Sequence, residues 1–133
     1  MEGRDGQISL MRELPPKTIL IVEQKEALAQ LLVYIISLAT SYYPLLASDA
    51  HQALAIVEQE PVDLFVLNDD PSYEPNGMDL YEQLHRIPNL EHVPAIMIGA
   101  TLPQKQIPLG TLVGLSKPFT INDLLVRLHR LLT

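Results

Sequence analysis

The amino-acid sequence predicts an α/β fold, a doubly wound five-stranded parallel sheet with helices on both faces. Five short apolar runs are spaced along the chain. Amphipathic helical patterns separate most of these runs, and parallel strands require such crossover connections. The runs are apolar throughout rather than alternating with polar residues, as expected of strands that are buried on both faces.

The predicted strands are short and rich in β-branched or leucine side chains. They are residues 18–22, 43–47, 63–67, 95–98 and 112–115. Pro44 indicates that the second strand lies at an edge of the sheet, because proline cannot donate a hydrogen bond to a neighbouring strand.

The predicted helices carry apolar residues at intervals of three and four. They are residues 26–39, a helix that begins after Ser48 or Asp49, residues 78–86 and residues 121–132. Thr120 and Asp123 have the spacing of a capping box at the start of the last helix. Pro103 and Pro108 leave no room for a full helix between the fourth and fifth strands.

The first 16 residues show no periodic pattern and end in two prolines, so we expect an N-terminal arm (1–16) before one domain (17–133). The chain has no cysteine and begins without an apolar signal segment, which favours a cytoplasmic protein. Its net charge of −7 argues against nucleic acid as a partner. The longest apolar stretch, residues 27–39, is too short to span a membrane.

The four histidines share no spacing typical of metal ligands, and we expect them to be surface residues without a functional role. They are His51, His85, His92 and His129.

Several segments match, in order, the pattern of response-regulator receiver domains of two-component systems. They are residues 19–23, 47–54, 61–67 and 94–98, and the triplet Lys117-Pro118-Phe119. Over residues 17–133 the chain therefore resembles a CheY-like receiver domain. The resemblance implies the flavodoxin-like strand order 2-1-3-4-5, here with the fourth helix shortened or missing. It also implies that the Lys117–Pro118 peptide bond is cis, as this bond often is in the family.

The resemblance further implies where the chemistry of a receiver domain would lie. In the family, an aspartate at the end of the third strand accepts a phosphoryl group from a histidine kinase, with Mg²⁺ held by acids at the end of the first strand. Carried over by position, Asn68 falls on the acceptor, Glu23 retains the first acid and Gln24 replaces the second. An asparagine amide is not a usable nucleophile at neutral pH.

Three further positions belong to the signalling switch of the family. Gly99 falls where a hydroxyl reports phosphorylation, Gly114 falls where an aromatic residue switches, and Lys117 falls on the lysine that neutralises phosphoryl charge. Only Glu23 and Lys117 retain the family's residue types, and we expect these two side chains to pair with each other.

These departures predict a degenerate, or pseudo-receiver, variant. We expect a protein-interaction module that works without phosphorylation, has no catalytic residues and no enzyme activity, and needs no cofactor. Its expected partner is a protein of a signalling pathway, either a histidine kinase or an output domain.

An alternative alignment remains open, because the loop after Asn68 holds one more residue than the family pattern. If that residue belongs to the strand, Asp69 becomes a working phosphoacceptor that uses Mg²⁺, with Glu23 and Asp69 as candidate metal ligands. Asp70 and Glu74 would add acidic side chains to such a pocket. We favour a solvated acidic loop over a metal site, because Gln24 offers only a neutral oxygen.

A more distant alternative is a small flavodoxin-like enzyme or nucleotide-binding protein, but no glycine-rich phosphate loop follows the first strand.

The first predicted helix carries more apolar residues than one buried face requires. Val33, Tyr34 and Leu38 lie off the inward stripe. Either the arm covers them through Ile8, Leu10 and Met11, or they form a partner surface or a homodimer contact.

Overall fold

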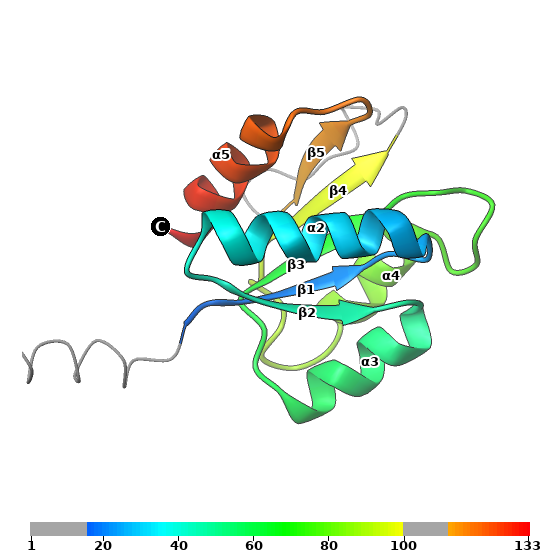
Figure 1. Cartoon of the computed structure of the whole chain (residues 1–133). Coiled ribbons are helices and arrows are strands. Elements are labelled where there is room, and N and C mark those ends of the chain that lie inside the picture. The colour runs from blue at the N-terminus through cyan, green and yellow to red at the C-terminus, as the bar shows by residue number, and fades with distance from the viewer. Residues whose placement is uncertain (1–15, 100–111) are drawn as a thin grey trace, which may run out of the picture.

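The computed structural model describes residues 16–99 and 112–133, which form a parallel sheet with helices on both faces (Figure 1). The five strands are β1 Thr18–Val22, β2 Tyr43–Ala47, β3 Leu64–Asn68, β4 Ala95–Gly99 and β5 Leu112–Ser116. Their order is β2-β1-β3-β4-β5, and every neighbouring pair is parallel. The predicted fold class and strand order are confirmed.

The helices in the described residues are α2 Glu26–Ala39, α3 Ala50–Gln59, α4 Gly77–His85 and α5 Ile121–Leu132. Asp49 rather than Ser48 caps α3, since its carboxylate accepts a hydrogen bond from the backbone N–H of Gln52 at 2.8 Å. Thr120 and Asp123 form the predicted capping box at the start of α5. None of the described helices is both long and apolar enough to cross a membrane.

The core consists of two layers, one on each face of the sheet, because side chains alternate along each strand. Ile21 and Val66 belong to the layer covered by Leu32 of α2 and Leu124 of α5. The opposite layer contains strand residues such as Phe65 together with side chains of α3 and α4. Figure 1 shows α2 and α5 on one side of the sheet and α3 and α4 on the other.

The carboxyl ends of the strands meet at one edge of the sheet, as the register requires. Val22 of β1 pairs with Leu67 of β3, Asn68 of β3 pairs with Ile98 of β4, and Gly99 of β4 pairs with Ser116 of β5. The residues that end or follow these strands therefore lie near one another, where binding sites of doubly wound sheets are found.

The peptide bond Lys117–Pro118 is cis, as the resemblance predicted, and Glu74–Pro75 is cis as well. Two predictions lie outside the described residues. One is the shortened or missing fourth helix, which would fall between Ala100 and the start of β5. The other is the N-terminal arm, of which only Pro16 is described.

Candidate functional site

Glu23 and Asn68 form the centre of the candidate site at the carboxyl ends of β1 and β3. The two side chains are 2% and 8% exposed, and they are the buried polar or charged residues among those described. Their positions follow from the register, since each stands one residue beyond the pair Val22 and Leu67. The site thus combines a buried carboxylate with a buried amide.

A hydrogen bond of 2.7 Å joins the two side chains, and the Nδ2 group of Asn68 donates it to Oε1 of Glu23. A carboxylate only accepts, so the amide nitrogen must face it. The other oxygen, Oε2, accepts from the backbone N–H of Lys25 at 3.0 Å. Hydrogen bonds to a charged group contribute about 1.5–3 kcal/mol each. Neutral donors therefore stabilise the buried charge of Glu23.

The predicted ion pair between Glu23 and Lys117 is wrong. Both residues lie in the described part of the chain, and no ion pair joins them there. Glu23 already receives hydrogen bonds on both oxygens, so it has no need of a cation. Lys117 is half-buried instead, and its backbone N–H donates to the carbonyl of Gly99 at 2.9 Å.

Gln24, which replaces the second acid, leaves a polar atom without a partner. Its Oε1 atom is buried and accepts no hydrogen bond from the described residues. Burying an amide oxygen without a donor costs free energy. This oxygen is the unsatisfied polar atom of the candidate site.

Asp69 and Asp70 follow β3 directly. The backbone N–H of Asp69 donates to the carbonyl of Ile98 at 2.7 Å and so continues the pairing of β3 with β4 by one residue. Because successive residues of a strand point to opposite faces, we expect the side chain of Asp69 to point away from that of Asn68.

Asp70 is partly exposed, and its pKa is lowered from 3.8. The largest cause is the hydrogen bond that the Ser72 hydroxyl donates to its carboxylate at 2.7 Å, and the Ser72 backbone N–H donates a second at 2.9 Å. The charges of Lys25 and Lys117 lower it further. Asp70 is therefore held in its ionised form by its own turn.

These residues do not fit a Mg²⁺ site of the kind that the family uses. Magnesium is bound through oxygen ligands, usually carboxylates. Here Glu23 is the buried carboxylate, and both its oxygens are engaged, while Gln24 and Asn68 supply neutral amides. Among the described residues, no three His, Cys, Asp or Glu side chains are arranged to hold a metal ion.

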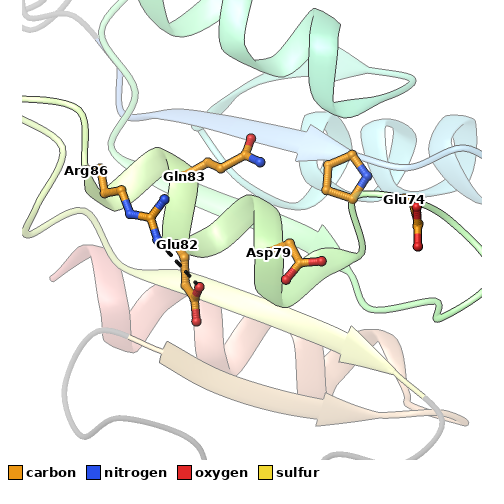
Figure 2. A pocket seen from close by; sticks show the side chains of 6 residues that line it. Glu74, Asp79, Glu82, Gln83 and Arg86 are labelled. Carbon is orange, nitrogen blue, oxygen red and sulfur yellow. Dashed lines mark ion pairs between the residues drawn. The ribbon is translucent and has the colours of Figure 1, made fainter.

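The less favoured alternative, an acidic pocket that combines Glu74 with Glu23, is not seen among the described residues. Glu74 lines a separate open hollow along α4, together with Asp79, Glu82 and Arg86 (Figure 2). In this hollow, Arg86 and Glu82 form an exposed ion pair at 4.0 Å. Such exposed pairs contribute little to stability.

The two predicted glycine positions lie on neighbouring strands. Gly99 ends β4, and Gly114 lies within β5 opposite Met97. Beside Gly99 is Ser116, an exposed residue at the end of β5. Ser116 is thus the hydroxyl nearest in register to the end of β4.

His85 was wrongly predicted to be a surface residue without a role. It is half-buried, and its two ring nitrogens lie 2.9 Å from the carbonyl oxygen of Tyr81 and 2.8 Å from that of Val93. Its ring also packs against Tyr81, with centroids 4.0 Å apart, and edge-on against Phe65. His85 therefore links α4 to the segment before β4. Its spacing of four residues from the buried Tyr81 on the same helix was the available signal.

Comparison with known proteins finds similar solved structures but no match by sequence. No family model matches the sequence, and no curated protein matches it. The chemotaxis protein CheY4 of Vibrio cholerae superposes with a TM-score of 0.79 at 21% identity, over 88% of this chain and 99% of that chain. A CheY-like receiver domain protein from Methanospirillum hungatei JF-1 has a TM-score of 0.77 at 23% identity, over 89% and 94% of the two chains.

A third similar structure is the receiver domain of a signal transduction histidine kinase from Syntrophus aciditrophicus. It has a TM-score of 0.75 at 23% identity, over 87% of this chain and 89% of that chain. The three relatives agree in fold. This chain has the fold of CheY-like response-regulator receiver domains.

Proposed function

We propose that this chain is a pseudo-receiver of two-component signalling, which binds a protein partner without being phosphorylated. The observation that carries the proposal is the hydrogen bond of 2.7 Å from Asn68 to Glu23 at the end of β3. If Asn68 occupies the phosphoacceptor position, as the resemblance implies, the chain has an amide in place of the carboxylate, and amides do not attack phosphoryl donors at neutral pH.

The surrounding residues support the same conclusion. Gln24 is a neutral group where a second acid would hold Mg²⁺, and Gly99 has no hydroxyl with which to sense a phosphoryl group. Charge stabilisation by Lys117 has no target at a neutral Asn68. Each change removes a different part of phosphoryl transfer, so restoring one part would not restore the reaction.

The proposal includes the class of partner and the setting. It assigns no catalytic residue, no enzyme activity, no cofactor and no nucleic-acid ligand to this chain. The partner is a histidine kinase or an output domain of a cytoplasmic signalling pathway, as in the class of proteins whose fold the chain shares.

The test is the intact mass of the full chain after incubation with Mg²⁺ and a small-molecule phosphodonor. The proposal predicts no phosphoryl adduct on the parent chain or on the Asp69→Ala variant. A known phosphorylatable receiver domain, treated in parallel, shows that the donor is active.

The alternative acceptor Asp69 gives a different result. An adduct on the parent chain that disappears in Asp69→Ala would make this a working receiver domain and overturn the proposal. An adduct that persists in Asp69→Ala would be mapped to a residue by fragmentation. If that residue lay at the carboxyl ends of the strands, the proposed function would be contradicted as well.

A further inference from the structure

The outer side of α2 exposes a strip of large apolar side chains. Leu31, Tyr34 and Leu38 are 51%, 63% and 69% exposed. Their spacing of three and four residues places them on one side of the helix. Isolated apolar residues on a surface are ordinary, but a continuous strip indicates a surface that something covers.

The strip continues into a groove between α2 and the start of α5, with a volume of about 550 Å³. The groove is lined mainly by apolar side chains, namely Leu28, Leu31, Leu32 and Ile35 of α2, Phe119 of the loop before α5, and Ile121 of α5. Ile121 is 53% exposed, and Leu31 belongs to both the groove and the strip. We call the combined surface, residues 28–38 of α2 with residues 118–121, the α2–α5 face.

The N-terminal segment of the chain joins the domain beside this face. The carbonyl of Lys17 accepts a hydrogen bond from the backbone N–H of Tyr43 at 2.8 Å. Only residues 40–42 separate Tyr43 from the end of α2, where Leu38 lies. In Figure 1 the start of β1 and the C-terminal end of α2 lie at the same end of the molecule.

The same N-terminal segment carries an apolar cluster that suits the face. Between positions 8 and 14, Ile8, Leu10, Met11 and Leu14 are apolar, whereas residues 2–7 are polar or glycine. An extended chain covers about 3.3 Å per residue, so Leu10 can lie up to roughly 20 Å from Pro16. Leu31 and Leu38 are only about 10 Å apart along the helix axis.

We propose that residues 8–14 pack across the α2–α5 face of their own chain, as a tethered ligand that a protein partner would have to displace. Tethering favours this occupant over a second copy, because a short linker holds the segment at an effective concentration of about millimolar. The inference goes beyond the proposed function, and it holds whether or not the domain is phosphorylated.

Paramagnetic broadening in the full chain tests the proposal. The chain has no cysteine, so Ser9→Cys provides a single site for a nitroxide spin label. The backbone amide signals of Leu31, Tyr34 and Leu38 are expected to lose most of their intensity. The signal of Ala53, in α3 on the opposite face of the sheet, is expected to keep its intensity and serves as the internal reference.

Two controls separate the possible occupants. In the spin-labelled chain that also carries Leu10→Ser and Met11→Ser, the signals of α2 should regain their intensity. If the broadening persisted, it would come from the nearness of the segment alone and not from apolar packing, and the proposal would be overturned. A mixture of spin-labelled chain with isotope-labelled, unmodified chain should show no broadening. Broadening in the mixture would show that a second copy covers the face. An absence of broadening in the spin-labelled chain itself would show that residues 8–14 do not cover the face and that an external partner must. Either result overturns the proposal.

Discussion

At the scale of single residues, the pair formed by Glu23 and Asn68 determines what the strand ends can do. A buried carboxylate without a cation requires donors, and Asn68 supplies one through a side chain nearly identical in shape to aspartate. Asn68 therefore stabilises the buried carboxylate of Glu23. On the proposed function, the same amide also cannot accept a phosphoryl group.

Asn68→Asp is expected to lower the free energy of unfolding by about 1–3 kcal/mol at pH 7, because it replaces a donor with a second carboxylate in a buried contact. Urea unfolding without divalent cations measures this loss. Asp69→Asn is the neighbouring control, and equal stability of Asn68→Asp and the parent at pH 7 would contradict the account.

Ser72→Ala is expected to raise the pKa of Asp70 towards 3.8, because the hydroxyl hydrogen bond is the largest cause of the lowered value. A lowered carboxyl pKa stabilises the folded state above the unfolded pKa, and this contribution is lost as the pH falls through the folded pKa. Carbon NMR titration of the Asp70 carboxyl measures the change. Lys25→Gln should raise the pKa less, and the reverse order would show that charge rather than the turn controls Asp70.

At the scale of secondary-structure elements, α4 packs closely against the strand ends because its first residue, Gly77, has no side chain. A Cβ atom on Gly77 would lie 2.6 Å from Sδ of Met97, 2.8 Å from the carbonyl oxygen of Asn68 and 2.9 Å from Cα of Asp69. Two of these contacts are backbone atoms, which cannot turn aside. The helix therefore starts in direct contact with the residues of the candidate site.

Gly77→Ala is expected to lower the free energy of unfolding by about 1–3 kcal/mol, the usual cost of overpacking a core position. Chemical denaturation measures the change. Glu82→Ala on the same helix is the control, since it removes only an exposed ion pair at 4.0 Å and should have little effect. If Gly77→Ala were as stable as this control, the close packing of α4 against β3 would be wrong.

The elements themselves were predictable because apolar runs mark the buried strands, and β1 and β2 have the predicted bounds. The end of β3 was not, since Asn68 is polar and enters the strand only through its pairing with Ile98. The positions of Glu23 and Asn68 at one edge followed from the parallel topology. The hydrogen bond between them could not be predicted, because it depends on which donor lies within hydrogen-bond distance of the carboxylate. The sequence alone favoured Lys117, because of its charge.

At the scale of the whole molecule, similarity of fold does not require similarity of the side chains that carry the chemistry. Sequence identities of 21–23% accompany TM-scores of 0.75–0.79 with receiver domains, so the arrangement of the sheet and its covering helices is shared although most side chains differ. The core of the described residues lies in two apolar layers, away from the polar side chains at the strand ends. A shared fold therefore does not determine the chemistry at that edge.

The proposed function requires that the site formed by Glu23 and Asn68 does not respond to phosphodonors. Amide and side-chain NMR spectra of the full chain, recorded before and after addition of Mg²⁺ with a small-molecule phosphodonor, test it most directly. The account predicts that the signals of Glu23, of the Asn68 side chain and of Gly99 do not move. A second set of signals at these residues or at Asp69, formed only when Mg²⁺ and donor are both present, would contradict it.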